Sequence, residues 1–454
     1  MTRKSSPSSP ERDALIAQIV EKMHRQLREQ LPDTTATLDQ IEDIAGQIGR
    51  QVSQDIQKKL VEERNLSPRP PKTQCSCGSI ARYKGQQTRS VVTVHSLLTY
   101  DRACYHCPTC HKSIAPLDQG LGLDTGCTTT QVRLWVALLC GQLPFAQAAT
   151  TLEMLTKVSL SAASMERIGI AIGTSLRQEQ HQVAQAHQHG HLPQPASKRP
   201  QRLYVGMDGV FVPLRDAWKK DKSLGDLSCR YGECKSGVVY EASQDKAGRD
   251  TRVRTRAYVA TLDKVDTFAP LLGTLAHESG HHLAKEVVVI GDGAPWIWQI
   301  AAKQFSGAVQ IVDFFHAAQH LSSVAEARFG KGNAQGEAWV QARCEELKTS
   351  GVEAVLVHLK EWRPTKQTDK ELRRVTYVYF SDNAERMQYP RFLAKGYHIG
   401  SGVVEATCKQ VVAQRLDQAG MHWTKHSAEA IVALRAAQLS TNPPDLRPYC
   451  AMPA

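Results

Sequence analysis

The chain has 454 residues, 41% of them hydrophobic, which is enough to bury a core in each of roughly two to four domains. Lys and Arg number 56 against 45 Asp and Glu, and the resulting net charge of +11 favours an anionic partner such as nucleic acid or an acidic membrane surface. The start of the chain lacks the apolar core of a signal peptide, and apolar runs such as LWVALLC are too short to span a bilayer. We therefore expect a cytoplasmic protein without membrane insertion. The positive net charge does not require an anionic partner, because it is also explained by the need of a protein to stay soluble.

Residues 1–66 form the first predicted region, with helical periodicity over residues 11–62 and a break at residues 32–35. A small helical hairpin packed on the rest of the protein and an element for self-association explain this pattern equally well. The Pro-rich stretch SPRPPK then marks a linker.

Five of the 12 cysteines fall between Cys75 and Cys110, within the predicted module of residues 67–127, which indicates a local metal site in a reducing compartment rather than a disulfide framework. The candidate Zn²⁺ ligands are Cys75, Cys77, Cys107 and Cys110. The spacing of CPTC lets both thiolates reach one tetrahedral ion, whereas the first pair has only one intervening residue. Cys104 or His111 could therefore replace one of the four ligands. We expect a zinc-ribbon-like module with a structural zinc.

Residues 128–178 carry three helical periods, and a short polar turn separates the second from the third. This layout is typical of a helix-turn-helix DNA-binding segment, but many helix pairs with this spacing bind no DNA, and the third helix offers only Arg167 as a cation. Residues 179–201, rich in Gln, His and Pro, are predicted to be an interdomain linker. Its histidines are expected to belong to a solvated tether rather than to a metal site.

Residues 202–454 change to alternating strand and helix. Three successive strands are predicted, over residues 203–214, 228–243 and 255–262, the second holding a turn at its Lys-Ser-Gly. Helix, strand, helix and strand follow between residues 266 and 317, and helices are expected over residues 317–360 and 402–439. The pattern predicts an α/β fold with a mixed sheet.

Three acids lie in otherwise apolar segments of this region. Asp208 is expected at the end of the first strand and Asp292 at the carboxyl end of VVVIG. Each is followed by Gly, so either alone would be an ordinary turn, but two at strand ends of one sheet favour a site. Glu405 lies in the first turns of a predicted helix at the edge of its apolar stripe; a solvated Glu near a helix N-terminus is the competing explanation.

Three carboxylates suit Mg²⁺ or Mn²⁺, and two such ions can activate the attacking oxygen and stabilise the leaving oxygen at phosphorus. Asp313 and His316, in IVDFFHA, put an acid and an imidazole one helical turn apart. They could orient a phosphate or the leaving oxygen, although an Asp that caps the next helix explains the pattern equally well.

The segments DGVFVPL, VVIGDGAPWIWQIA, VDFFHAAQHL and GYHIGSGVVEATCKQVVAQRL closely resemble bacterial insertion-sequence transposases of the ISKra type, related to the Mutator-like DDE transposases. The resemblance covers roughly residues 72–440. It implies an RNase H-like catalytic domain with an α-helical insertion at about residues 317–395. It also implies a DDE triad at Asp208, Asp292 and Glu405, with Asp313 and His316 as accessory residues.

The expected function is that of a DDE transposase, which binds the terminal inverted repeats of its element and target DNA and transfers DNA strands with Mg²⁺ or Mn²⁺. Pairing two DNA ends predicts a homodimer or higher oligomer. The alternatives are a non-catalytic DNA-binding regulator derived from a transposase and an RNase H-like nuclease or resolvase. Six basic residues are candidate phosphate contacts or part of a solvated charged face: Arg252, Arg254, Arg256, Lys409, Arg415 and Lys425.

Overall fold

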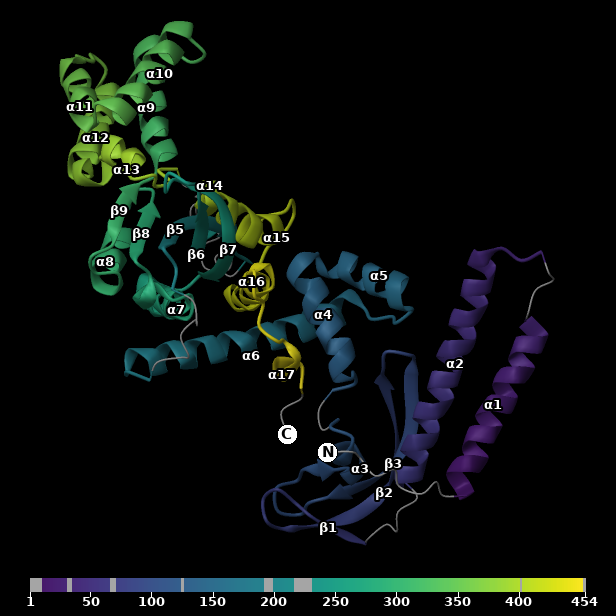
Figure 1. Cartoon of the computed structure of the whole chain (residues 1–454). Coiled ribbons are helices and arrows are strands. Elements are labelled where there is room, and N and C mark those ends of the chain that lie inside the picture. Colours follow the sequence, from purple (N-terminus) through teal and green to yellow (C-terminus); the bar gives the residue numbers. More distant parts are fainter. Residues whose placement is uncertain are drawn as a thin grey trace. The chain divides into compact units, whose positions relative to one another are not determined.

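The computed structural model describes residues 10–30, 35–65, 71–123, 126–191, 199–215, 231–400 and 402–451. The chain divides into two compact units. The first comprises residues 1–140, 144–168 and 446–454, and the second residues 141–143 and 169–445. Both units are drawn in Figure 1.

The N-terminal part of the chain contains α1 (Pro10–Gln30), α2 (Leu38–Asn65), β1 (Lys72–Gln74), β2 (Ile80–Val92), β3 (Leu97–His106), β4 (Ser113–Ile114), α3 (Pro116–Gly120), α4 (Thr130–Gln142), α5 (Phe145–Thr156) and α6 (Ala162–Gln188). The α/β part continues with β5 (Arg202–Pro213), β6 (Tyr231–Gln244), β7 (Asp250–Thr261), α7 (Val265–Glu278), η3 (His281–Leu283), β8 (Glu286–Gly291), α8 (Pro295–Gln304) and β9 (Val309–Val312). The remaining elements are α9 (Phe314–Phe329), α10 (Ala334–Thr349), α11 (Val352–Glu361), α12 (Gln367–Asp382), η4 (Ala384–Met387), α13 (Tyr389–Ala394), α14 (Gly402–Thr407), η5 (Cys408–Ala413), α15 (Gln414–Leu416), α16 (Lys425–Leu439) and α17 (Arg447–Cys450).

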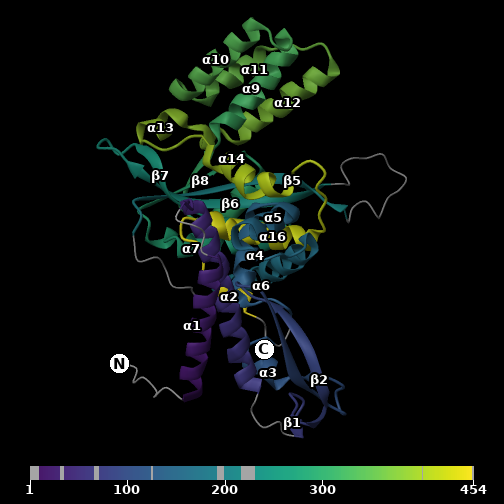
Figure 2. The ribbon, with the colours of Figure 1, turned by 90° about the vertical axis from the view of Figure 1, so that its right-hand side faces the viewer.

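The two helices expected at the N-terminus are confirmed, and α1 and α2 lie side by side in Figures 1 and 2. Lys22 Nζ forms an ion pair with Asp55 across the hairpin at 2.5 Å. The break expected at residues 32–35 lies almost entirely outside the described residues. Val61 of α2 also packs on Leu98 and Tyr100 of β3. This contact attaches the helical hairpin to the sheet formed by β1–β4.

The cysteine-bearing sheet has four antiparallel strands in the order β1-β2-β3-β4. It is a long β2–β3 ribbon with a short strand on either side, and the cysteines lie at the end where all four strands meet. The three helices expected after it are present as α4, α5 and α6. However, α6 continues to Gln188, so the linker predicted to begin at residue 179 begins at least ten residues later; its residues 192–198 lie outside the described chain.

The second unit is built on a mixed five-stranded sheet in the order β7-β6-β5-β8-β9. β5, β6 and β7 are antiparallel neighbours, whereas β8 and β9 run parallel to β5. This confirms the mixed α/β sheet. Two expectations were wrong in detail: the turn predicted at Lys235–Gly237 is part of the continuous strand β6, and Asp208 lies within β5, which continues to Pro213.

Helices cover both faces of this sheet. On one face, Phe268 and Leu272 of α7 reach within 3.1 Å and 2.8 Å of the position that a Cβ on Gly237 would take. On the opposite face, Val404 of α14 comes within 2.3 Å of a Cβ built on Gly206. Glycine at these positions therefore permits the close approach of helix to strand. Gly206 and Asp208 are two residues apart, so α14 lies on the face of β5 to which Asp208 belongs.

Helices α9 to α13 form a separate group between β9 and α14, visible together in Figures 1 and 2. Helices were predicted over residues 317–360 and are present there, and the helical segment continues beyond residue 360 with α12. The last helices are less regular than predicted, because a π-helical segment, η5, interrupts α14 and α15. Arg415, a candidate phosphate contact, is fully buried with its guanidinium 5.0 Å from the centre of the Trp423 ring, so that assignment was wrong.

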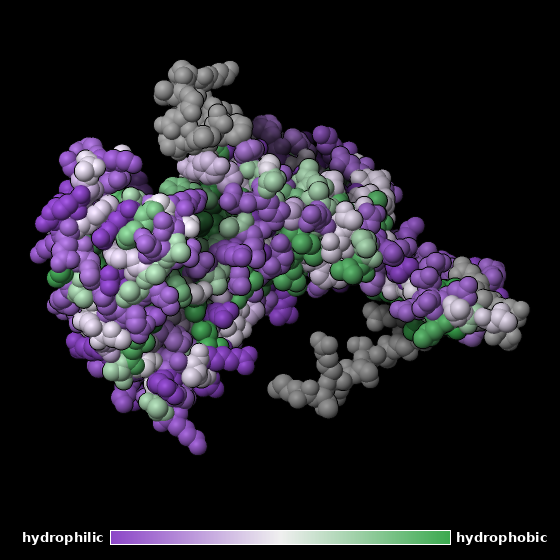
Figure 3. Space-filling view, turned by 90° about the horizontal axis from the view of Figure 1, so that it is seen from above, coloured by the Kyte–Doolittle hydropathy of each residue, from purple (hydrophilic) through white to green (hydrophobic). Residues whose placement is uncertain are grey.

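Hydrophilic residues dominate the face drawn in Figure 3, with hydrophobic residues scattered among them. Within the described chain, every helix is too short or too polar to cross a membrane.

Candidate active site and cysteine cluster

Three aspartates occupy one row across neighbouring parallel strands. Met207 of β5 pairs with Gly291 of β8, and Gly291 pairs with Val312 of β9. The next residues along these strands are Asp208, Asp292 and Asp313. Because the pairing of parallel strands runs in register, the three carboxylates follow one another along the edge where β8 and β9 end. Ligands of α/β sheets commonly bind at this edge.

The Asp208 carboxylate is half-buried between β5 and η5. Its Oδ1 accepts a hydrogen bond from the backbone N–H of Gly209 at 2.6 Å, and its Oδ2 accepts one from Cys408 Sγ at 3.5 Å. Burial raises the pKa of Asp208, and repulsion from Asp292 raises it further. The charge of Asp292 therefore acts on Asp208, and a cation between the two carboxylates would relieve their repulsion.

Asp292 lies in the turn between β8 and α8. Its Oδ1 accepts from the N–H of Ala294 at 2.8 Å, and Gly293 between them has a φ of 106° that favours glycine. Tyr379 of α12 donates its hydroxyl to the backbone carbonyl of Asp292 at 2.9 Å, and its ring stacks on His320 of α9 with centroids 3.9 Å apart. The helical group α9–α13 thus contacts the turn that carries the aspartate.

Asp313 acts both as the cap of a helix and as the partner of His316, the two roles that the sequence suggested. Asp313 is buried and caps α9, its Oδ1 accepting from the N–H of Phe315 at 3.0 Å. Its Oδ2 accepts from His316 Nδ1 at 2.8 Å. This hydrogen bond raises the pKa of His316, with further contributions from the charges of Asp292 and Asp208. The imidazole therefore belongs to the same electrostatic cluster as the aspartates.

Glu405 is the least closely associated of the three triad candidates. Its side chain is exposed on α14, and the three triad carboxylates are absent from the groups of potential ligands found within 4.8 Å of one another in the described chain. Cys408, three residues later, contacts Asp208. Three residues of helix rise about 4.5 Å, so the backbone of Glu405 lies within roughly one helical turn of that contact.

Sequence reasoning missed two residues of this site. The thiol of Cys408 lies between Asp208 and Ser236, whose Oγ is 3.0 Å from Cys408 Sγ. Its position three residues after Glu405 is the signal that could have identified it. Tyr379 lies far away in sequence, and no local pattern links it to Asp292. Cys408 also begins the π-helical η5, and such segments are often found at functional sites.

The four cysteines predicted as zinc ligands come together at the end of the antiparallel sheet. The Sγ atoms of Cys75, Cys77, Cys107 and Cys110 all lie within 4.8 Å of one another. The Cys75–Cys110 and Cys77–Cys107 pairs are 3.5 Å and 3.6 Å apart. Four sulfurs at 2.3 Å from a tetrahedral zinc would be roughly 3.8 Å apart, so the donor set fits Zn²⁺.

Backbone geometry explains how the irregular first pair of cysteines joins the cluster. Gly78 has a φ of 85° and donates its N–H to the carbonyl of Cys75 at 2.9 Å, which folds the CSCGS segment tightly. Hydrogen bonds from the backbone N–H and side chain of Ser79, together with those to Cys75 and Cys107, lower the pKa of Cys77 to about 6, which favours the thiolate. The two alternative ligands are outside the cluster: Cys104 donates to Gln87, and His111 adopts a φ of 58° at the end of the second loop.

Comparison with known proteins assigns the chain to a family. The model of an uncharacterised protein family, UPF0236, matches residues 81–444. The chain belongs to UPF0236. A UPF0236 relative from Streptococcus gallolyticus, described as the UPF0236 protein in the vanSb 3'region, is 23% identical over 340 residues, covering 72% of this chain and 67% of that protein. The UPF0236 match includes the whole mixed sheet and the second cysteine pair but begins after Cys75 and Cys77.

Proposed function

We propose that this protein is a DDE-type transposase that binds the ends of a mobile element and catalyses divalent-metal-dependent DNA cleavage and strand transfer. The observation that carries the proposal is the alignment of Asp208, Asp292 and Asp313 on three neighbouring strands. The strand order β7-β6-β5-β8-β9 is compatible with the RNase H-like catalytic domain that the resemblance to ISKra-type transposases implies, and α9–α13 would form its helical insertion.

The acidic residues fit a hard divalent cation. Asp208 and Asp292 repel each other in a half-buried setting, and carboxylate oxygens are the ligands that Mg²⁺ and Mn²⁺ prefer. Asp208, Asp292 and Glu405 would hold the metal, which when bound activates the attacking oxygen and stabilises the leaving oxygen at phosphorus. The exposed Glu405 would complete the site from α14, next to the helical turn that already contacts Asp208.

The Asp313–His316 pair would act on the phosphate rather than as a nucleophile. Asp313 holds the imidazole through Nδ1 and raises the pKa of His316, so the ring carries a positive charge over a wider pH range. A charged imidazole whose other nitrogen is an N–H donor can bind a phosphate oxygen or protonate the leaving oxygen. Asp313 would therefore be a positioning residue, and His316 the group that meets the substrate.

DNA binding is proposed for the N-terminal half together with exposed cations of the α/β unit. Zn²⁺ held by the four cysteines would be structural, and α4–α6 would include the helix-turn-helix segment. Arg252, Arg254 and Arg256 are exposed along β7 and can meet the phosphate backbone. The exposed Ile41 and Leu60 on the α1–α2 hairpin suit a homodimer that pairs two DNA ends.

The test is incubation of the full chain with Mg²⁺ and DNA bearing the inverted repeats that flank its reading frame. We expect cleavage at the repeat ends and joining of the cut 3′ ends to a second DNA. Asp292→Asn should abolish both reactions, whereas Asp266→Asn, on the first turn of α7, should retain them. Cleavage without joining would indicate a nuclease or resolvase, and binding without cleavage a DNA-binding regulator.

A further inference from the structure

Three histidines gather where α7 ends, away from the row of aspartates. His277 is in the last turn of α7, and His281 and His282 are in η3. Gly280 between them has a φ of 85°, a left-handed conformation that turns the chain back toward the helix. As a result, one potential ligand nitrogen from each of the three imidazoles lies within 4.8 Å of the other two.

Two of these imidazoles have ring nitrogens without a hydrogen-bond partner. His277 is only 5% exposed, and its Nε2 is buried and unpaired among the described residues; Nδ1 of His281 is in the same state. A buried polar atom without a partner destabilises the folded state, so two such nitrogens in one cluster of imidazoles are consistent with a bound ion.

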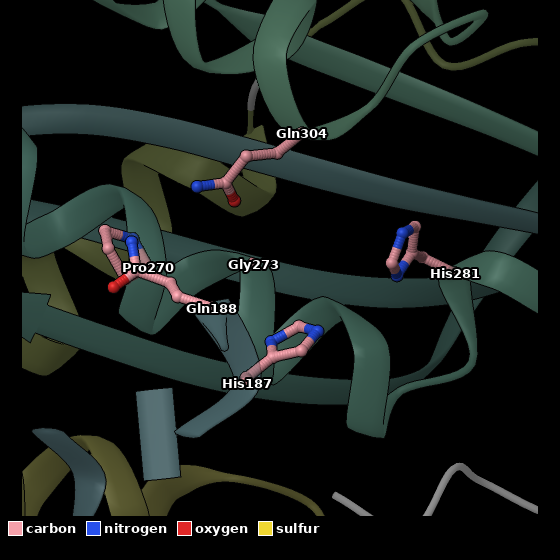
Figure 4. A pocket seen from close by; sticks show the side chains of 6 residues that line it. All are labelled: His187, Gln188, Pro270, Gly273, His281 and Gln304. Carbon is pink, nitrogen blue, oxygen red and sulfur yellow. The ribbon is translucent and has the colours of Figure 1, made fainter. Parts of the chain in front are cut away.

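A fourth histidine and a cavity adjoin this cluster. The ring of His187, from the last turn of α6, lies 4.9 Å from that of His277, and its Nδ1 is 2.9 Å from Thr274 Oγ1. A pocket of about 270 Å³ is lined by His187, His281 and Gln304, whose side chains come from α6, η3 and α8 (Figure 4). Oε1 of Gln304 is likewise buried without a hydrogen-bond partner in the described chain.

We propose that His277, His281 and His282 bind a transition-metal dication, with Zn²⁺ as the physiological candidate and His187 and the pocket beside the remaining coordination position. Imidazole nitrogens bind Zn²⁺, Co²⁺, Ni²⁺ and Cu²⁺, whereas Mg²⁺ prefers the oxygen ligands of the aspartate row. The ion would satisfy the buried nitrogen of His277 and tie the end of α7 to η3. The ion would also lie next to α6, the helix that carries His187 and precedes β5 in the chain.

The site requires one side chain to turn. The rings of His277 and His282 are stacked, with centroids 4.2 Å apart and planes 15° from parallel. Lone pairs of imidazole nitrogens lie in the ring planes, so two parallel stacked rings cannot both point at one ion. His282 is exposed and can rotate about its side-chain bonds without disturbing the core.

The experiment measures zinc bound per chain in the full-length protein without a polyhistidine tag, after removal of metal and titration in the presence of excess Mg²⁺. We expect about two zinc ions per chain, one at the cysteines and one at the histidines. His281→Gln/His282→Gln should bind one fewer. His189→Gln, which removes a histidine of the same region outside the cluster, should match the wild type.

A second variant separates the two sites. Cys77→Ser/Cys107→Ser removes the cysteine site and should still take up one equivalent of Co²⁺, with visible ligand-field bands but without the near-ultraviolet thiolate-to-cobalt band. Failure of this variant to bind Zn²⁺ or Co²⁺ would overturn the proposal, as would equal zinc uptake by the wild type and His281→Gln/His282→Gln. Because the readout is metal content, either result is independent of transposase activity.

Discussion

Gly206→Ala should disturb the packing that brings α14 to the aspartate row. A Cβ at this position would lie 2.3 Å from Val404 Cγ2 and 3.1 Å from Val238 Cγ1, whereas ordinary contact begins near 3.4 Å. Val404 is β-branched and has few alternative rotamers, so α14 must move by roughly 1 Å. Overpacking of this kind costs about 1–3 kcal/mol, and the smaller entropy of an unfolded Ala returns about 0.5–1 kcal/mol. We expect a net loss of about 1–2 kcal/mol.

The assay is urea unfolding of the purified protein, followed by the DNA cleavage rate at saturating Mg²⁺. A 1 Å displacement of a catalytic group can slow a reaction by about 100-fold, so cleavage should fall more than stability alone explains. Gly402→Ala is the matched control, because it lies on the same helix with no atom within 4 Å of its added Cβ. It should be neutral or slightly stabilising. Equal stabilities of Gly206→Ala and Gly402→Ala would refute the packing argument.

Three further predictions address the charged and metal-binding groups. Cys107→Ser should unfold the antiparallel sheet, which is detected as rapid proteolysis of residues 72–114. Cys104→Ser is the control and should leave this segment protected. Equal protection of the segment in the two variants would contradict the zinc assignment. Asp208→Asn should raise the free energy of unfolding of the metal-free protein at pH 7, because burial raises the pKa of Asp208 and its charged form is disfavoured in the folded state. The gain should vanish as the pH falls below the ordinary carboxyl pKa, and a variant less stable than wild type at pH 7 would argue against it. The pair with Asp313 raises the pKa of His316, so its contribution to stability is complete below the ordinary histidine pKa of about 6.5 and is lost as the pH rises through the folded-state value. Urea unfolding of His316→Gln should therefore deviate more from wild type at pH 6 than at pH 9, and a pH-independent difference would exclude this ion pair.

Part of the α/β unit was predictable because apolar runs mark its buried strands. The run VVVIG followed by Asp292 and a Pro-initiated helix fixes β8 and α8 almost to the residue. Asp208 was assigned to a strand end because Gly209 resembles a turn, yet pairing with β6 continues through both residues. The same reasoning failed at Lys235–Gly237, where neighbouring strands override the local turn preference.

The sequence predicted which residues belong to the sites better than it predicted how those residues are arranged in space. The CPTC spacing identified two of the four clustered cysteines, but only the positive φ of Gly78 explains how the CSC segment brings the other two to them. Cys408 and Tyr379 reach the aspartates through tertiary packing, to which sequence spacing is blind. His187 was assigned to a solvated linker, because Gln- and His-rich composition hid the last turns of α6 and their contact with α7.

The most direct test of the aspartate site is a change of metal preference. Wild-type protein should cut DNA with either Mg²⁺ or Mn²⁺. Asp292→Cys replaces a hard oxygen ligand with a thiolate that binds Mg²⁺ poorly and Mn²⁺ better. The variant should therefore be inactive with Mg²⁺ and regain cleavage with Mn²⁺. Cleavage by Asp292→Cys at the wild-type rate in Mg²⁺ would contradict the assignment of Asp292 as a ligand of the catalytic metal.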